Sequence, residues 1–461
     1  MKTSKKTTIF YFIFLSMLFF SSCKDNNPTP TPTPTTSNGK KIIPVYEPIT
    51  ESTTWTNENR YLIKGNVYVV AGAELTIQAG TTIFGDKLSK GALIVCRGAK
   101  IHANGTASAP IVFTSAASKG FRNSGDWGGV VILGRSPNNQ SNDQSIEGIS
   151  APEGDSGKYG GTIENDNSGE FTYVRIEYAG VALSPDNELN CLTFGSVGSG
   201  TTIHHVQVSF GGDDSFEWFG GSVNTKYLVA YSSWDDDFDT DFGYRGKNQF
   251  LASFRNPNLA DKSGSCSFES DNDGSGSGKT PLTSAVFSNV TSFGPWVFAP
   301  LNQGNLSRSN ANANFTRGAH IRRNSALKIY NSVIVGWGAQ QGVYFDKTNA
   351  DAAFKSNYLA RTLGNVKEKN EGTLFDDSKF DNDNFIQEDQ STVDLSAILT
   401  GMTGSMNIAN LTFQPSPNSI LLSSKTITTD GLEQTSYIGA FDGNSNWMEG
   451  WTNFDPQNTD Y

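Results

Sequence analysis

Short apolar runs, often alternating with polar residues, recur through most of the chain and are separated by turn residues. In the first quarter of the sequence these runs lie at residues 67–70, 74–77, 82–84, 92–95, 99–101 and 110–114. Breaks such as Ala71-Gly72, Ala79-Gly80 and Asn104-Gly105 stand between them. Short runs bounded by glycine predict β-strands and tight turns, whereas long stretches with a helical period are almost absent. The pattern predicts an all-β protein.

The middle of the chain repeats itself at a fixed spacing. Residues 206–209 match residues 228–231, and residues 213–217 match residues 235–239, with an offset of 22 residues in both cases. This spacing is close to one coil of a right-handed parallel β-helix, in which equivalent positions stack about 4.8 Å apart. The match of Phe287-Ser288-Asn289-Val290 with Tyr330-Asn331-Ser332-Val333 is 42 or 43 residues apart and fits two such coils.

We therefore predict a single-stranded right-handed parallel β-helix of about 22-residue coils over residues 42–380. A leucine-rich repeat is excluded, because the chain lacks leucine at fixed positions. After Phe354 the strand rhythm weakens, and Asp394–Met402 is expected to form a short helix. Residues 381–461 are expected to form an irregular C-terminal cap with long loops over the last open coil.

The N-terminus has the features of a lipoprotein export signal. Lysines at positions 2, 5 and 6 precede an apolar run from Ile9 to Phe20, and Phe20-Ser21-Ser22-Cys23 resembles a lipobox cleavage site. The apolar run is too short to span a bilayer, which takes about 20 residues. We predict a signal peptide over residues 1–22, a lipidated Cys23 that anchors the protein to a membrane, and a tether over residues 23–41. Pro28–Thr36 alternates proline and threonine, a composition that stays extended.

Composition and charge narrow the possible partners. The chain has 47 glycines, 30 phenylalanines and a formal net charge of −11, and this charge argues against nucleic acid as a ligand. Apart from Cys23, three cysteines remain, so at most one disulfide can form within the chain. Cys96 lies in an apolar run and is expected to pack as a small apolar residue. Cys191 and Cys266 could pair, although their spacing does not decide it.

Several motifs resemble those of a known group of proteins. The run "AGAELTIQAGTTIFG", followed by "ALIVCRGAKIHANGT" and "PIVFTS", resembles the opening coils of bacterial pectin-lyase-like β-helix proteins. A largely uncharacterised group of Bacteroidetes surface lipoproteins has motifs that resemble "DWGGVVILG", "GGDDSFEWFGG", "DFGYRGKNQF" and "FESDNDG". Lys24-Asp25-Asn26-Asn27 resembles the short charged signal that exports such lipoproteins to the cell surface. This resemblance implies a β-helix on an outer-membrane lipoprotein exposed at the cell surface. It implies no activity.

Acidic residues gather in the two repeating coils. Because side chains alternate in a strand, Asp235, Asp237, Asp239 and Asp241 should share one face. The repeat should place Asp213 beside Asp235 and Glu217 beside Asp239, about 5 Å apart. Such carboxylates repel one another, and the repulsion could be relieved by bound Ca²⁺, by a shared proton, or by pairing with Arg245 and Lys247. Alternatively, these carboxylates are solvated turn residues without a specific partner.

Calcium suits this ligand set, because it takes six to eight oxygen ligands in flexible geometry. A second acidic segment, residues 269–274, has carboxylates at alternate positions before a glycine, but Thr280 stands where an EF-hand has its bidentate glutamate. The candidate metal ligands are Asp213, Asp235, Asp237, Asp239, Glu269, Asp271 and Asp273.

The same acids could be catalytic. Gly212-Asp213-Asp214 resembles the Gly-Asp-Asp of polygalacturonase-type hydrolases, in which paired carboxylates protonate the leaving oxygen and activate water. The other parts of that signature are missing, and Arg322-Arg323 is a poor match for its Arg-Ile-Lys. A lyase would use calcium and a basic residue, for which Arg245 is the candidate. The catalytic candidates are Asp213, Asp214, Glu217, Asp236, Asp239 and Arg245.

Aromatic residues crowd the same coils and suggest a third role. An exposed ring beside carboxylates suits a sugar, with apolar stacking on the face and hydrogen bonds at the edge. Tyr227 and Tyr231 share the outward parity of Phe219, whereas Trp218 and Trp234 take the inward one. Such rings could equally fill the core. The candidate ligand-binding residues are Phe219, Tyr227, Tyr231, Trp234 and Tyr244.

Three functions remain open on the sequence. The leading hypothesis is a lipid-anchored β-helix that binds an extracellular glycan or another surface polymer without catalysis, with calcium holding the acidic coils together. The second is a polysaccharide hydrolase or lyase that acts through the acidic coils. The third is a structural or adhesive spacer.

Overall fold

The computed structural model describes residues 36–149, 157–184, 187–297, 311–376, 378, 380–387, 415, 417–422 and 426–461. The chain divides into two compact units, and Thr36–Tyr461 holds all the described residues. Cys23, most of the predicted tether and the expected helix at Asp394–Met402 lie outside them. Among the described residues no helix is both long and apolar enough to cross a membrane.

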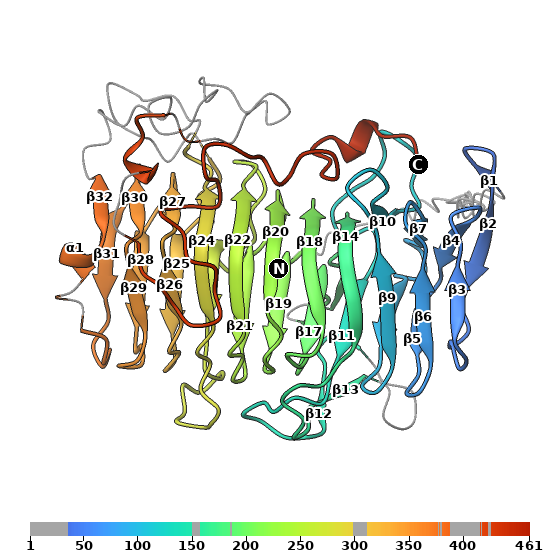
Figure 1. The fold of residues 1–461 in the computed structure, drawn as a ribbon, viewed down its shortest axis with the longest axis horizontal. Coiled ribbons are helices and arrows are strands. Elements are labelled where there is room, and N and C mark those ends of the chain that lie inside the picture. Colours follow the sequence, from blue (N-terminus) through green and yellow to red (C-terminus); the bar gives the residue numbers. More distant parts are fainter. Residues whose placement is uncertain are drawn as a thin grey trace, which may run out of the picture. The chain divides into compact units, whose positions relative to one another are not determined.

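The unit Thr36–Tyr461 is a right-handed parallel β-helix, which confirms the predicted fold (Figure 1). One side is a sheet of ten parallel strands, each paired with its counterpart in the next coil. We call it the ten-stranded sheet, and its members are β5 (Asn66–Val69), β8 (Ala92–Val95), β11 (Gly129–Leu133), β17 (Leu192–Gly195), β19 (Phe216–Phe219), β21 (Phe238–Asp241), β23 (Cys266–Ser270), β25 (Arg317–Arg322), β28 (Gln341–Asp346) and β31 (Asn365–Lys369).

A second sheet of eighteen strands forms the rest of the wall. Five of its strands are long and bend at one residue with positive φ, so that the chain turns a corner without leaving the sheet. These strands, with the bend residue after each, are β14 (Gly169–Glu177; Tyr173), β18 (Thr202–Ser209; His205), β20 (Thr225–Tyr231; Tyr227), β22 (Lys247–Phe254; Phe250) and β24 (Val286–Phe293; Asn289).

The remaining elements are short. The other strands of the eighteen-stranded sheet are β1 (Thr36–Ser37), β2 (Lys40–Val45), β3 (Thr53–Trp55), β4 (Arg60–Ile63), β6 (Glu74–Ile77), β7 (Thr82–Gly85), β9 (Lys100–Asn104), β10 (Ile111–Ser115), β26 (Lys328–Tyr330), β27 (Val333–Val335), β29 (Ala353–Lys355), β30 (Tyr358–Ala360) and β32 (Phe385–Gln387). Two small hairpins join β12 (Gln144–Ser145) to β13 (Lys158–Tyr159) and β15 (Ala182–Ser184) to β16 (Asn187–Glu188). The short helices are α1 (Phe380–Asp383), η4 (Ile420–Leu422) and η5 (Pro456–Asn458).

The strand register confirms the 22-residue repeat in the middle of the chain, but the coils differ in length. Phe216 pairs with Phe238, an offset of 22, whereas the coil that takes Ile111 to Val174 spans 63 residues. Phe287 pairs directly with Ile329, so the 42-residue spacing is one coil and not the two that we expected. Long loops between strands lengthen the coils while the strand register is kept.

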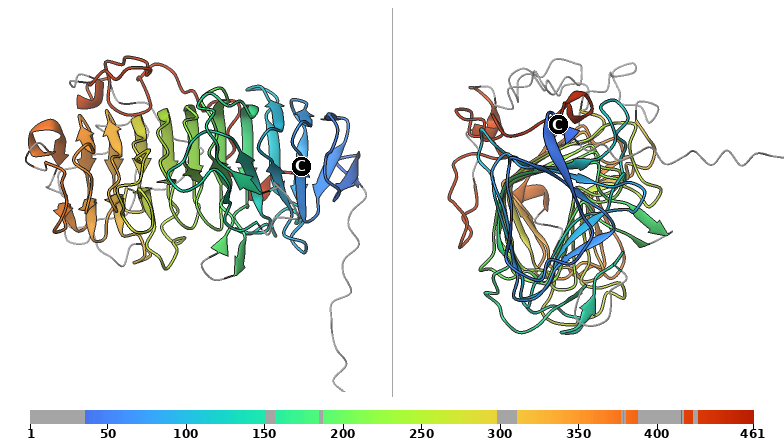
Figure 2. Two further views of the ribbon diagram at one scale, coloured as in Figure 1. Left: turned by 90° about the horizontal axis from the view of Figure 1, so that it is seen from below. Right: turned by 90° about the vertical axis from the view of Figure 1, so that its right-hand side faces the viewer.

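Stacked rings fill the interior, which the strands enclose on all sides when viewed along the stack (Figure 2). The ring centroids of Phe216 and Phe238 are 5.9 Å apart, and those of Phe238 and Phe268 are 5.5 Å apart. Equivalent positions of successive coils thus supply equivalent core side chains. Among the described cysteines, no disulfide forms: Cys191 and Cys266 are both buried thiols and do not pair.

The C-terminal segment, residues 426–461, lies along the side of the stack, and we call it the strap (Figure 1). Buried amide side chains of several coils bind its backbone. Asn331 exchanges two 2.8 Å hydrogen bonds with the backbone of Ile427, and Gln207 does the same for Asn453 at 2.7 and 2.8 Å. At the last coil the described residues include α1, where Phe380 packs on Phe354. Residues 388–414 of the expected cap lie outside the described residues. The strap runs back toward the first coils (Figure 1).

We expect Asn289→Ala to loosen the strap. Asn289 is fully buried at a positive φ, and its Nδ2 donates to Tyr437 O at 3.2 Å and Gly439 O at 3.1 Å. Loss of these bonds at a position that alanine tolerates poorly should cost about 2 kcal/mol. Hydrogen exchange of strap amides should therefore accelerate. Asn258→Ala, in an exposed turn, is the control, and equal exchange in both variants would contradict the role of Asn289.

Candidate functional site

One row of side chains crosses the outer face of the ten-stranded sheet. Strand pairing places Glu217 beside Asp239, Asp239 beside Glu269, and Glu269 beside His320. Their chain neighbours Phe216, Phe238 and Phe268 stack in the core, so the acids face outward. The predicted neighbours Glu217 and Asp239 do meet.

Three of these carboxylates form a buried group, which we call the inner acidic group: Asp214, Glu217 and Asp239. One oxygen from each lies within 4.8 Å of the others. Asn190 Nδ2 donates to Glu217, and Asp214 Oδ1 accepts from the backbone N–H of Asp236 at 2.8 Å. Among the described residues, no lysine or arginine forms an ion pair with any of the three.

Burial raises the pKa of each of these acids well above its ordinary value, and the adjacent carboxylates raise it further. For Glu217 the next cause after burial is Asp239. Burial and neighbouring carboxylates also raise the pKa of Asp236, whose Oδ1 accepts a hydrogen bond from the N–H of Cys266 at 2.5 Å. At neutral pH the group therefore tends to hold protons or a cation.

A second group, the outer acidic group, consists of Asp213, Asp214 and Asp235, again with oxygens within 4.8 Å. The predicted neighbours Asp213 and Asp235 thus come together, and both are less buried than Asp214. Burial raises the pKa of Asp235 to about 6, although Ser263 Oγ donates to it at 2.6 Å and opposes this rise.

Trp234 directly precedes Asp235, and its side chain is 41% exposed. Its backbone is fixed, since its N–H donates to Gly211 O at 3.0 Å and its carbonyl accepts from Ser265 Oγ at 2.7 Å. The inward parity expected for Trp234 is wrong. Strand β21 begins only at Phe238, so alternation does not extend to residue 234.

Asp237 is also misplaced by that rule. It is fully buried and forms a 2.8 Å ion pair with Arg255, which is itself fully buried. Arg255 in turn lies 5.1 Å from the ring centroid of Phe315. A charge enters the core only with a partner, and Asp237 is therefore a structural ion pair rather than a metal ligand.

Arginines neutralise the next acids along the row. Arg322 pairs with Glu269 and, at 2.7 Å, with Asp271, and Arg323 also reaches Asp271 at 2.7 Å. Burial alone would raise the pKa of Glu269, but His320 and Arg322 outweigh it and the pKa is lowered. The sequence pattern does not reveal the approach of Arg322 to these acids, because long loops separate it from them along the chain.

Asp273 does not belong to the site. Its carboxylate accepts hydrogen bonds from Ser275 and Ser277 within its own turn. Although burial opposes the change, these bonds lower its pKa.

Arg245 lies away from the acidic groups. It pairs with Glu164 and donates to the carbonyls of Pro137 and Gly243 at 3.2 and 3.1 Å. Lys247 Nζ donates to Asp430 O at 2.5 Å. Neither residue relieves the acidic stack, and Arg245 is not placed to act as a base there.

Of the five predicted aromatic ligand residues, only Trp234 is an exposed ring. Tyr244 is fully buried against Trp218, with ring centroids 5.3 Å apart, and Phe219 packs on Tyr159. Tyr227 lies on the eighteen-stranded sheet under the strap, where its ring meets Trp447. Tyr231 likewise meets Phe454.

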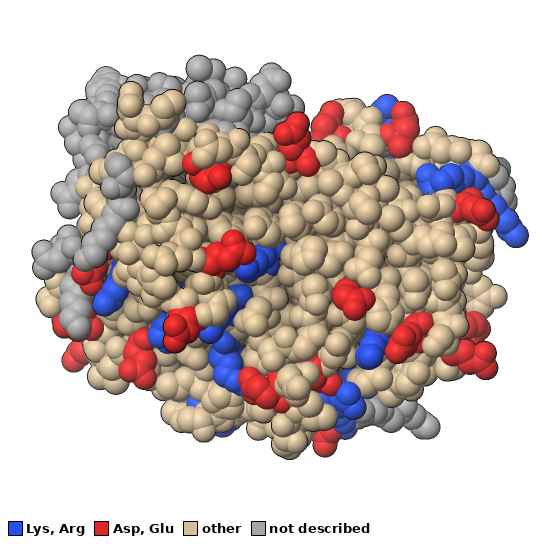
Figure 3. All heavy atoms as spheres, viewed as in Figure 1, with Lys and Arg blue, Asp and Glu red and all other residues tan. Residues whose placement is uncertain are grey.

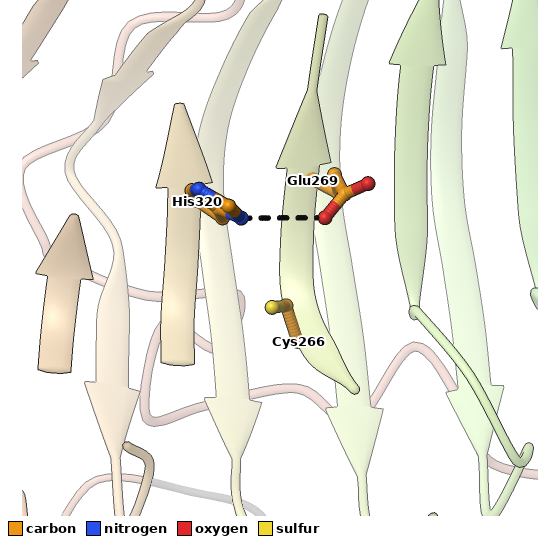
Figure 4. A group of neighbouring side chains, drawn as sticks. All are labelled: Cys266, Glu269 and His320. Carbon is orange, nitrogen blue, oxygen red and sulfur yellow. Dashed lines mark ion pairs between the residues drawn. The ribbon is translucent and has the colours of Figure 1, made fainter. Parts of the chain in front are cut away.

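Cys266, Glu269 and His320 also bring possible metal-ligand atoms within 4.8 Å of one another (Figure 4). His320 Nδ1 lies 3.4 Å from Glu269 Oε1, marked by the dashed line in the figure. However, Arg322 already neutralises Glu269, and burial raises the pKa of the Cys266 thiol well above its usual value. A protonated thiol is a poor ligand, so this cluster is explained as part of the ion-pair network.

The face drawn in Figure 3 is mostly uncharged, and its basic side chains lie close to acidic ones. The net charge of −11 is therefore not displayed there as one broad patch.

Residues 47–452 match the family described as "Pectate-lyase like beta helix domain". No curated protein and no solved structure matches the chain.

The inner acidic group should make stability depend on pH. A raised pKa means that the folded chain holds protons that the unfolded chain releases near pH 4, so stability falls as pH rises toward the folded pKa. With chelator present, Glu217→Gln should stabilise the chain at pH 8 by roughly 1–2 kcal/mol, because it removes an unpaired buried charge.

This gain should shrink as the pH is lowered below 8 and wild-type Glu217 takes up its proton. Thermal melts of the full chain at a series of pH values measure it. Glu47→Gln, at an exposed position, is the control and should change nothing at any pH of the series. A Glu217→Gln chain that is less stable at pH 8 would show that Glu217 is ionised and well compensated.

Proposed function

Since the chain belongs to the family of pectate-lyase-like β-helix domains, we propose that it binds an extracellular polysaccharide beside Trp234 with the help of a calcium ion. The observation that carries this proposal is the exposed indole of Trp234 next to the outer acidic group. A ring offers apolar area to the face of a sugar, and carboxylates accept hydrogen bonds from hydroxyl groups at its edge.

Rigidity supports this role for Trp234. The hydrogen bonds of its backbone to Gly211 and Ser265 hold the residue in place while the ring stays accessible. A fixed aromatic side chain loses little conformational freedom when it binds a ligand. An exposed tryptophan on a held backbone is therefore better suited to binding than to packing.

The outer acidic group would hold the calcium ion. Asp213, Asp214 and Asp235 supply carboxylate oxygens within 4.8 Å of one another, and Ca²⁺ completes its shell of six to eight oxygens with water or sugar oxygens. The ion would offset the repulsion that raises the pKa of all three acids along with their burial. It would also allow an acidic polysaccharide to approach this negatively charged surface.

The proposed setting is the cell surface. A lipid on Cys23 and the Pro/Thr tether would hold the β-helix at an outer membrane, where polysaccharides are encountered. This part of the proposal rests on the sequence of residues 1–41.

Calcium should stabilise the full chain. At a concentration 100 times Kd it should add about 2.7 kcal/mol, seen as a rise in Tm relative to chelator. The double variant Asp213→Asn/Asp235→Asn should lose this rise, whereas Glu47→Gln/Glu51→Gln, at exposed positions, should keep it. Wild-type chain that melts at one temperature with calcium and with chelator would rule out the ion.

Trp234→Ala should weaken polysaccharide binding about 10-fold, because a stacked ring contributes on the order of 1–1.5 kcal/mol. Calorimetry with polygalacturonate, as the acidic probe, and dextran, as the neutral one, would measure it in the presence of calcium. Phe121→Ala removes another exposed ring, 75% accessible, and serves as the control. Equal binding by both variants would contradict the role of Trp234.

Polysaccharide cleavage is the second candidate, and the inner acidic group favours it. Asp214, Glu217 and Asp239 place acids with raised pKa close together, as general acid catalysis requires. Prolonged incubation with polygalacturonate would then release reducing ends or unsaturated uronates, and Glu217→Gln would abolish the release. Binding without either product would leave the chain a binding protein.

A further inference from the structure

A cavity of about 180 Å³ lies between the strap and the eighteen-stranded sheet. Tyr227 of β20 and Phe250 of β22 form one wall. The strap supplies the others: Glu433, Tyr437, Ala440, Asp442, Ser445 and Trp447. The cavity therefore exists only while the strap is in place.

Aromatic rings dominate its walls. The Tyr227 ring stacks on Phe250 with centroids 5.2 Å apart, and Trp447 tilts toward Tyr227 at 5.3 Å. Trp447 is held in turn, since its Nε1 donates to Ala440 O at 2.9 Å and its ring stacks on Phe441 at 5.6 Å. The rings thus keep their positions without a ligand.

The carboxylates of Glu433 and Asp442 also line the cavity, and that of Glu433 is neutralised. Glu433 pairs with Lys226 at 2.6 Å. Asp442 Oδ1 accepts from the backbone N–H groups of Asn444 and Ser445 at 2.8 and 2.9 Å, and none of the described residues donates a hydrogen bond to its Oδ2 or forms an ion pair with it. These bonds outweigh the effect of burial and lower the pKa of Asp442, so it stays ionised.

Tyr437 remains a neutral phenol beside Asp442, because burial and this carboxylate raise its pKa. The cavity consequently carries one uncompensated negative charge among electron-rich ring faces.

We propose that this cavity binds an organic cation, a ligand with a primary or methylated ammonium group. Ring faces attract cations, with an optimum near 6 Å or less from the centroid, and a carboxylate adds direct Coulomb attraction. A neutral sugar could use the rings but would leave Asp442 without a counterion. The site is separate from Trp234 and the outer acidic group, since it lies on the other sheet.

Binding there would also connect two parts of the chain. Gln249 holds Glu433 through reciprocal 2.8 Å hydrogen bonds, and Asn289 holds Tyr437 and Gly439. A ligand between Tyr227 and Trp447 would add a further link, so hydrogen exchange of strap amides should slow when it binds.

The direct test compares choline with its neutral isostere 3,3-dimethyl-1-butanol in calorimetric titrations of the full chain. We expect choline to bind at least 10-fold more tightly and to slow exchange in the strap. Glucosamine and glucose make a second pair of amine and neutral probe. Equal affinity within both pairs, or no binding by either amine, would overturn the proposal.

Asp442→Asn tests the charge alone, because asparagine keeps the oxygen that accepts from Asn444 and Ser445. It should weaken choline binding about 10-fold, while Glu449→Gln, at an exposed strap position, should leave binding unchanged. Unchanged binding in Asp442→Asn would also overturn the proposal. The comparison of charged and neutral probes on the wild-type chain holds even if a variant fails to fold.

Discussion

The structure depends on one constraint, the parallel register that places equivalent residues of successive coils side by side. Inside the stack this register is favourable, because Phe216, Phe238 and Phe268 form a continuous column. On the outer face of the sheet the same register is unfavourable, because it places the carboxylates of Glu217, Asp239 and Glu269 side by side. Like charges on adjacent strands must be compensated, and the two ends of the row differ in how this is achieved. Arg322 neutralises the end near Glu269, whereas no lysine or arginine among the described residues forms an ion pair with Asp214 at the other end.

Sequence reasoning succeeded where register alone decides the outcome. The fold, the 22-residue offset and the meeting of Asp213 with Asp235 follow from strand periodicity. It failed where strands end or loops lengthen a coil. Alternation could not place Trp234 and Asp237, since both precede β21. Long loops hid two features, the approach of Arg322 to Glu269 and the single 42-residue coil at Phe287, because an inserted loop and an additional coil have similar composition.

The strap is held on the other side of the molecule by side chains of several coils. Amides, among them those of Gln207, Gln249 and Asn331, form hydrogen bonds with its backbone. Nothing in the sequence of residues 426–461 suggests this, because the partners are single side chains and the strap has no strand pattern. The strap covers Tyr227 and Tyr231, which explains why these predicted ligand rings are half-buried, and it creates the aromatic cavity beside them.

We propose that a cation compensates the unpaired carboxylates beside the ten-stranded sheet. A crystal structure of the chain grown with calcium, with anomalous scattering to identify the ion, tests it most directly. We expect one calcium ion bound by Asp213, Asp214 and Asp235, beside Trp234. Clear density for these carboxylates, with only water between them at saturating calcium, would contradict it.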